Sequence, residues 1–226
     1  MRKVFVVLAA ILISVWMVSA STIPPCPSNV GYDVYVGLGS SGCVLDDKLF
    51  SNFTYSGSGS GGAVPLPASG VTVTAFNTPL FPGFQFQAPW SVGPGQTLDS
   101  LLQYDVKVLS GGHAITDIHA SMGGFGHVPD GIVFVAENIS GTFTGNLLLY
   151  DTVAGTVSSQ TILVDPSTMG PIHVIKDISV NGNNGFASVS QVINRFSEGG
   201  VPEPLTLLLM GSGLLGLGAL RWRKKS

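Results

Sequence analysis

Charged side chains are scarce in this 226-residue chain, in which Asp, Glu, Lys and Arg together make up 10% of the residues. Basic residues are scarcer still in its interior, because six of the ten lie in the first three and the last six residues. Between residues 21 and 200, four basic residues stand against twelve acidic ones, a formal charge of −8. Such a domain repels phosphate backbones, so we expect no nucleic-acid partner.

The common catalytic motifs are also missing. The sequence has no G-x-S-x-G, no H-E-x-x-H and no P-loop. Residues 21–200 contain only two glutamates, Glu137 and Glu198. Nothing singles out a pair among the ten aspartates of this segment for glycoside hydrolysis. We therefore predict that the chain is not an enzyme, with no catalytic residues, no cofactor and no metal. A secreted hydrolase remains the remote alternative.

Two groups of polar residues keep a metal alternative open. His113, Asp117 and His119 have the same parity, so on one strand they would face the same way, and imidazole with carboxylate can bind a divalent ion. A solvated strand face is the simpler interpretation. Asp46–Asp47 offers oxygen ligands for calcium, as does the Asn-rich segment 181–185, although turn chemistry explains the latter.

Long amphipathic helices are absent from the pattern, and strand signals are frequent. Apolar and polar residues alternate from Leu102 to Val108 and again from Val71 to Thr74. Short apolar runs follow at 132–136, 147–150, 162–164 and 172–175. Turn signals separate them: Pro129-Asp130-Gly131, Gly111-Gly112, Asn181-Gly182 and Asn184-Gly185. We predict an all-β ectodomain over residues 21–196, an antiparallel β-sandwich or jelly-roll-like fold.

Glycine-rich segments within this domain predict connections between strands. Residues 56–62, SGSGSGG, are expected to form a flexible loop. Residues 37–42 match G-x-G-x-x-G after a strand-like segment, 33–36, but no βαβ unit follows. We therefore interpret this motif as a turn between strands and not as a dinucleotide site.

Cysteine is limited to Cys26 and Cys43. In an exported chain an even pair indicates a disulfide, and closing this loop would contribute about 3 kcal/mol. A catalytic thiol is the sharper alternative.

Aromatic residues gather in FPGFQFQAPW, residues 81–90. Phe84 and Phe86 alternate with glutamines, which favours a strand that faces the core. Trp90 is the candidate platform for a sugar ring, against the simpler prediction that it is packed in the interior.

The two ends of the chain are apolar and flanked by cations. Residues 1–20 have a basic start, an apolar stretch and the small residues Ser19 and Ala20, the layout of a secretory signal peptide. Residues 205–220 are uncharged and predict a short transmembrane helix. The cluster Arg221, Arg223, Lys224 and Lys225 then stays in the cytoplasm as a basic tail, residues 221–226. Residues 197–204 are expected to be a linker that ends in the extended motif Val201-Pro202-Glu203-Pro204.

Pro-Glu-Pro, a short transmembrane run and a basic terminus, in this order at the end of a chain with a signal peptide, resemble the PEP-CTERM sorting signal. The resemblance covers about 26 residues. It implies that Val201, Pro202, Glu203 and Pro204 form the motif recognised by an exosortase, a membrane-embedded processing enzyme of Gram-negative bacteria that make extracellular polysaccharide. It also implies anchoring in the inner membrane before processing, and then a place at the cell surface or in the extracellular matrix.

The stretch from Cys26 to Gly61, with FQAPWSV and TLDSLLQYDV further on, is similar to an uncharacterised ectodomain that many PEP-CTERM proteins carry. That similarity implies no established activity. We expect a structural or adhesive component of an exopolysaccharide or biofilm layer, with a carbohydrate-binding module as the alternative.

Overall fold

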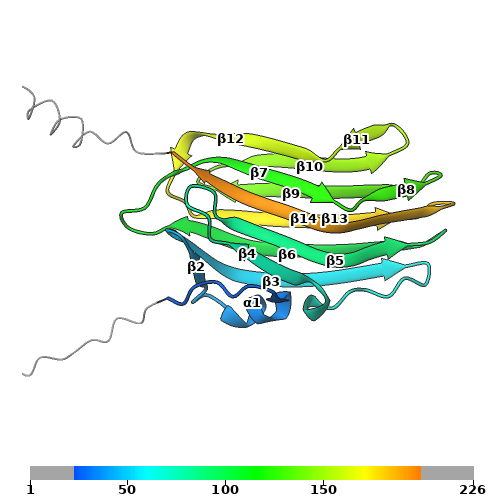
Figure 1. Ribbon diagram of the computed structural model, residues 1–226, viewed down its shortest axis with the longest axis horizontal. Helices are drawn as coiled ribbons and strands as arrows, with labels where there is room; N and C mark the ends of the chain where they lie inside the picture. The colour runs from blue at the N-terminus through cyan, green and yellow to red at the C-terminus, as the bar shows by residue number, and fades with distance from the viewer. Residues whose placement is uncertain (1–22, 200–226) are drawn as a thin grey trace, which may run out of the picture.

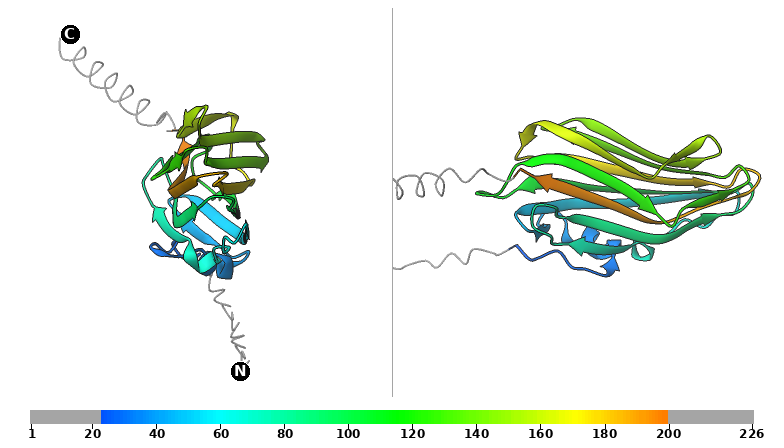
Figure 2. Two further views of the ribbon diagram at one scale, coloured as in Figure 1. Left: turned by 90° about the vertical axis from the view of Figure 1, so that its right-hand side faces the viewer. Right: turned by 45° about the horizontal axis from the view of Figure 1, so that its top comes forward.

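The computed structural model describes residues 23–199, which form two antiparallel sheets packed face to face (Figures 1 and 2). One sheet, called the β6 sheet, has the order β11 (Gly155–Val157), β10 (Gly145–Thr152), β9 (Ile132–Gly141), β13 (Ile172–Asn181), β6 (Thr97–Val108), β3 (Lys48–Ser60), β2 (Cys43–Leu45). The other, the β14 sheet, has the order β1 (Val30–Gly31), β4 (Thr72–Phe76), β5 (Gly83–Val92), β14 (Phe186–Glu198), β7 (Ile115–Gly123), β12 (Ser159–Thr168), with β8 (Gly126–Val128) also paired to β14. The predicted β-sandwich is confirmed.

Period-two alternation explains the core. In β6, Leu98, Ser100, Leu102, Tyr104, Val106 and Val108 are buried, while the alternate residues between them are partly or fully exposed. The opposite sheet does the same with β5 and β14, so that the inward side chains of the two sheets meet. The expected turns at Gly111-Gly112, Pro129–Gly131 and 182–185 each separate two strands.

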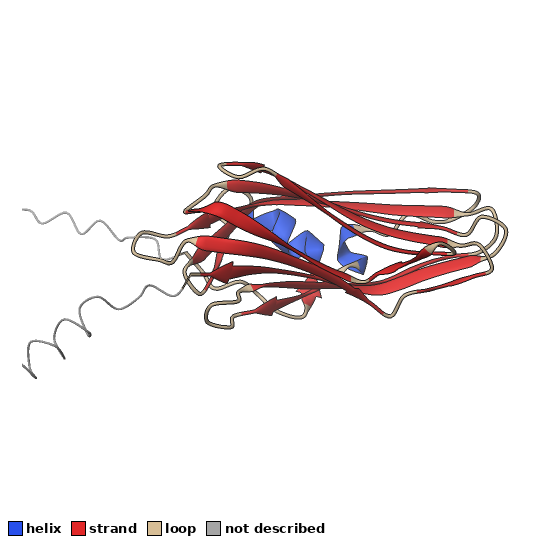
Figure 3. Ribbon diagram, turned by 90° about the horizontal axis from the view of Figure 1, so that it is seen from above, coloured by secondary structure: helices blue, strands red, loops and turns tan. Residues whose placement is uncertain are grey.

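A short helix, α1 (Tyr32–Leu38), is a correction to the sequence analysis, which predicted a strand over residues 33–36. Tyr32 and Tyr35 lie on one face of this helix, three residues apart, and both are buried among core aromatics. Helical spacing buries both rings, whereas a strand would place them on opposite faces. Figure 1 shows α1 along the edge of the sandwich beside β3, and the view from above in Figure 3 shows that α1 and the 3-10 helix η1 (Ala68–Gly70) span the opening between the two sheets at that edge. The G-x-G-x-x-G segment ends α1 and leads into β2.

Residues 56–60 belong to β3, so the prediction of a flexible loop over residues 56–62 was wrong for most of it. The glycines have a packing role there. A Cβ on Gly57 would lie 2.7 Å from the carbonyl oxygen of Leu66, and one on Gly59 would lie 2.6 Å from that of Ala63. The segment that follows β3, residues 63–66, therefore lies directly against β3, which has no side chains at Gly57 and Gly59.

Buried polar groups pair with one another in the core, both within the β6 sheet and between the two sheets. Lys176 and Glu137, neighbours on β13 and β9, form an ion pair with side chains that are 0% and 1% exposed. The Tyr104 hydroxyl donates to Asn194 Oδ1, and Trp90 Nε1 donates to Ser100 Oγ at 2.9 Å. Burial, reinforced by the charge of Glu137, raises the pKa of Tyr104 well above its usual value.

The two ends of the described chain lie at the same end of the sandwich, on the left in Figure 1. At the N-terminal side, the predicted Cys26–Cys43 disulfide is present, and Cys26 N donates to the carbonyl of Val44 at 3.0 Å. At the C-terminal side, β14 continues through Ser197 and Glu198, which the sequence analysis placed in the linker. Both are buried, because they pair with β7 and contact loop residues.

Several predicted features lie outside the described residues: the signal peptide 1–20, the motif 201–204, the transmembrane run 205–220 and the basic tail 221–226. Within residues 23–199, no helix has the length and apolar character needed to cross a bilayer.

Candidate functional site

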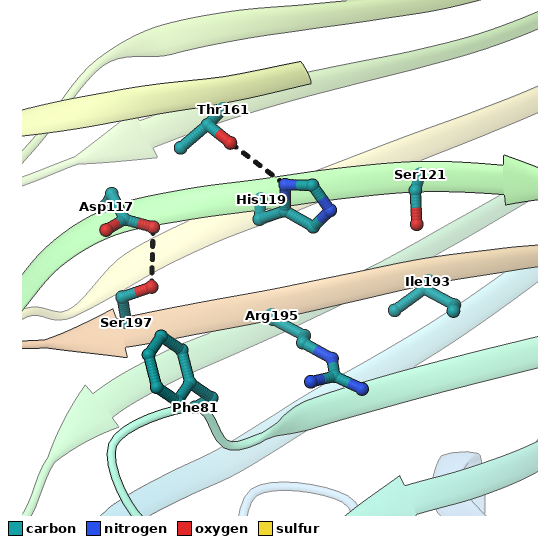
Figure 4. Close-up of a pocket in the computed structure, with 8 residues that line it drawn as sticks. All are labelled: Phe81, Asp117, His119, Ser121, Thr161, Ile193, Arg195 and Ser197. Atoms are coloured by element: carbon teal, nitrogen blue, oxygen red, sulfur yellow. Dashed lines mark hydrogen bonds between the residues drawn. The ribbon is translucent and has the colours of Figure 1, made fainter. Parts of the chain in front are cut away.

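A hollow of about 530 Å³ lies on the outer face of the β14 sheet. Three neighbouring strands and one loop supply its lining, which consists of Asp117, His119 and Ser121 on β7, Thr161 on β12, Ile193, Arg195 and Ser197 on β14, and Phe81 in the β4–β5 loop (Figure 4). The strand residues are the outward members of the alternation whose inward members, such as Ile118 and Phe196, fill the core.

Strand register brings the polar side chains together. Arg195 pairs with His119, and His119 pairs in turn with Thr161, so one row of the sheet carries all three. The next row joins Ser197 to Asp117. Because paired residues on one face of a sheet are close neighbours, the hollow is a continuous polar strip across three strands.

Hydrogen bonds hold part of this strip in place. His119 Nδ1 lies 2.9 Å from Thr161 Oγ1, and Ser197 Oγ donates to Asp117 Oδ1 at 2.6 Å (Figure 4). The guanidinium of Arg195 lies over the ring of Phe76, 4.6 Å from its centre. This stacking positions the guanidinium and leaves its N–H donors available to a ligand.

Chemically, the hollow offers donors, acceptors and one apolar ring. Arg195 supplies N–H donors, Asp117 supplies carboxylate oxygens, and Ser121 and Thr161 supply hydroxyls. Phe81 is 47% exposed at the rim. A polar strip beside an exposed aromatic ring suits a ligand that has hydroxyls along its edge and C–H groups on its face.

Trp90 was weighed as a sugar platform against the simpler prediction of a packed interior position, and the structure places it in the interior. Trp90 is 0% exposed and its indole N–H is bonded to Ser100 inside the core. Its parity on β5 matches that of Phe84 and Phe86, which are buried as predicted. Within residues 81–90, the aromatic ring that reaches solvent is that of Phe81, just before this strand.

His113, Asp117 and His119 do not share one face. In β7 both Ile115 and Ile118 are buried, because an irregularity in the pairing with β14 interrupts the alternation. Asp117 and His119 line the hollow, whereas His113 precedes the strand and lies near Asp47 and Glu198. The expected solvated strand face is therefore correct only for Asp117 and His119.

Sequence reasoning missed Arg195 and Thr161 as site residues. The available signal was that Arg195 is the single arginine of residues 21–200 and lies on a strand between two buried residues. What the sequence could not show is that β12, β7 and β14 are neighbours.

No family model and no curated protein sequence matches the chain. Three solved structures have similar segments. The carbohydrate-binding module TmCBM61, solved with β-1,4-galactotriose, aligns over 76% of this chain and all of its own length, at 13% identity and a TM-score of 0.31. A carbohydrate-binding module described as belonging to the β-sandwich superfamily aligns over 76% of this chain and 60% of its own, at 10% identity and a TM-score of 0.28. The enzymatically active domain of tailspike protein 4 from bacteriophage CBA120 aligns over 65% of this chain at 13% identity and a TM-score of 0.29, but the match spans only 19% of that protein. Likenesses this weak do not indicate what the present chain binds.

Proposed function

We propose that this chain is an exported cell-surface or extracellular-matrix protein whose β-sandwich holds extracellular polysaccharide through the hollow on the β14 sheet. The signal-peptide pattern, the PEP-CTERM-like tail and the Cys26–Cys43 disulfide support export. The inner membrane and an exosortase are the proposed partners during sorting. The proposed activity is binding and not catalysis.

The observation that carries the ligand assignment is the polar strip next to Phe81. A sugar residue presents neighbouring hydroxyls that both donate and accept. Arg195 can donate hydrogen bonds to the sugar hydroxyl oxygens, and Asp117, on the adjacent row, can accept hydrogen bonds from the hydroxyl groups. The ring of Phe81 suits the C–H face of the sugar.

The charge of the domain favours a neutral polysaccharide. Residues 21–200 carry a formal charge of −8, which repels polymers rich in carboxylates or sulfates. Arg195 is the only Lys or Arg in the lining of the hollow, and Asp117 offsets its charge. Uncharged hydroxyls therefore satisfy this site without electrostatic repulsion from the rest of the domain.

Sorting would act close to the folded domain. β14 ends at Glu198, and only three residues separate it from Pro202. Three residues span at most about 10 Å, so an exosortase that recognises Val201–Pro204 would work next to the end of the sandwich.

Binding to the neutral fraction of the producing cell's exopolysaccharide tests this proposal. We expect the exported protein to co-sediment with that fraction and Arg195→Gln to weaken binding at least tenfold. Lys107→Gln is the matched control, because Lys107 is exposed on β6, in the other sheet. Equal binding by wild type and Arg195→Gln would refute the role of the hollow.

The mass of the protein recovered from the cell surface or medium tests the sorting proposal separately. Loss of residues 1–20 and of the segment after Pro-Glu-Pro is the expected result. A mature protein that retains the segment 205–226 would be a single-pass membrane protein, and processing by an exosortase would then be wrong.

A structural role without any ligand is the second candidate. It is favoured by the long strands, several of which pair on both sides. The single carboxylate in the hollow provides no pair of acids for glycoside cleavage there. A protein that is processed as expected but binds no polysaccharide would support this candidate.

A further inference from the structure

A second hollow, of about 330 Å³, lies where the described chain ends, and it has a different chemistry from the polysaccharide hollow. Its lining includes Asp46 and Asp47 from the β2–β3 turn, His113 from the β6–β7 loop, and Glu198, the last residue of β14. One donor atom each from Asp47, His113 and Glu198 lies within 4.8 Å of the others. Three segments that are remote in sequence thus present metal-binding groups to one point.

Lys48 holds this group from the interior. Its ammonium is 0% exposed and donates to Asp47 Oδ1, to Glu198 Oε1 at 2.6 Å and to the carbonyl of His113 at 2.9 Å. It neutralises one of the two carboxylates and leaves a net negative charge. Lys48 contacts one oxygen of each carboxylate, so the other oxygen of each remains on the opposite side.

On that opposite side, three donor atoms meet. His113 Nδ1 lies 3.3 Å from Asp47 Oδ2 and 3.5 Å from Glu198 Oε2. With metal–ligand bonds of about 2.1 Å, the ligands of a tetrahedral zinc ion are about 3.4 Å apart. The two distances from His113 Nδ1 to the carboxylate oxygens are close to that value.

Glu198 Oε2 provides the independent sign of a ligand. The Glu198 side chain is 0% exposed, and this oxygen has no hydrogen-bond partner among the described residues. A buried carboxylate oxygen without a partner is costly, because it loses its hydration without gaining a hydrogen bond. A cation at this point would relieve this cost.

We propose that Asp47 Oδ2, His113 Nδ1 and Glu198 Oε2 bind a divalent transition metal, with Zn²⁺ as the probe. One nitrogen and two carboxylate oxygens form a donor set typical of zinc and its neighbours. Lys48 is the positioning residue that orients both carboxylates. Gly111 and Gly112 also line the hollow, and a Cβ on Gly112 would lie 2.5 Å from Asp47 Oδ2.

The metal would tie the end of β14 to the β2–β3 turn and the β6–β7 loop. The contact with the β6–β7 loop already exists in part, because Gly199 N donates to the carbonyl of Ala114 at 3.2 Å. Glu198 N also donates to the carbonyl of Leu80, in the β4–β5 loop, at 3.1 Å. The site would therefore stabilise the point at which the chain leaves the domain toward Pro-Glu-Pro.

Zinc binding by the exported protein, purified without a polyhistidine tag, tests the proposal. After dialysis against Zn²⁺ we expect one equivalent of metal per chain by elemental analysis, and a rise in Tm that EDTA reverses. His113→Ala should weaken Zn²⁺ binding at least tenfold. The matched control is His173→Ala, because His173 is also partly exposed but pairs with a single carboxylate, Asp105.

Glu198→Gln is the second variant and keeps the shape of the side chain. It should also lose at least tenfold in Zn²⁺ affinity, while circular dichroism without metal checks that it folds. Wild-type protein that takes up no stoichiometric Zn²⁺ would overturn the proposal. Zn²⁺ binding that neither His113→Ala nor Glu198→Gln weakens would also overturn it, and so would a protein that binds Ca²⁺ but not Zn²⁺.

Discussion

Removal of the buried cation Lys176 should be among the most damaging single changes in the sandwich. Lys176 lies on β13 with its side chain 0% exposed, and its ammonium contacts Glu137 Oε2 on β9. The other oxygen, Glu137 Oε1, has no hydrogen-bond partner within residues 23–199. In Lys176→Met the carboxylate would remain in the core without any described partner for either oxygen.

The magnitude follows from this burial. Breaking a buried ion pair by removing one partner typically costs about 3–5 kcal/mol, because the remaining charge is uncompensated. In a domain of this size each kcal/mol lowers Tm by about 2–4 °C, so the expected fall is about 6–20 °C. Replacing both members, as in Glu137→Leu with Lys176→Met, should recover most of the loss, since apolar substitutes for a buried pair are often neutral or stabilising.

Denaturant unfolding of the exported protein measures these differences. Circular dichroism follows the sheets, and fluorescence follows Trp90, the one tryptophan of residues 23–199, which is fully buried. Lys107→Met removes an exposed lysine from β6 and should change the free energy of unfolding by no more than about 0.5 kcal/mol. A loss below about 1 kcal/mol in Lys176→Met, or a double variant as unstable as the single one, would refute the reasoning.

Three further changes test other parts of the fold. The pKa of Asp177 is raised by burial and by the charge of Asp99, so the folded state binds this proton more tightly than the unfolded state, and stability falls as pH rises through the carboxyl range. Asp177→Asn should therefore stabilise the domain at pH 7 by up to about 1 kcal/mol and lose this advantage near pH 3 in thermal melts. An equal gain at both pH values would argue against this explanation. Reduction of Cys26–Cys43 should lower the free energy of unfolding by about 3 kcal/mol in denaturant titrations with and without reductant, and unchanged stability would show that the bridge contributes nothing. Gly57→Ala places a Cβ 2.7 Å from a backbone carbonyl oxygen and should cost about 1–3 kcal/mol by the same assay, and a neutral or stabilising effect would contradict the close packing described for β3.

Much of the fold was predictable because it depends on local pattern. The alternation from Leu102 to Val108 gave the strand β6 and its buried face, and Phe84 and Phe86 gave those of β5. The errors occurred where tertiary packing overrides composition. Gly57 lies in a strand because a neighbouring segment covers it, and Tyr35 lies in a helix because its ring fills a gap between the sheets.

The candidate site was predictable only in fragments. Asp117 and His119 were recognised as neighbours on one strand face, but Arg195 and Thr161 were not joined to them. Trp90 was weighed as a surface platform and, more simply, as a core residue, and its parity with Phe86 on β5 agrees with the core position. In the second hollow, Asp47 and His113 were each noted as ligands, but in separate groups and without Glu198.

The sequence by itself therefore determined the composition of each strand, the side on which most residues lie, the pairing of its two cysteines and the predicted export and sorting signals at its ends. Only the tertiary structure decided which strands are neighbours, and hence that Arg195, His119 and Thr161 form one row, and that Asp47, His113 and Glu198 meet at one point. The physical reason is that alternation depends on residues two apart, whereas strand order depends on the packing of two whole sheets, to which every buried side chain contributes.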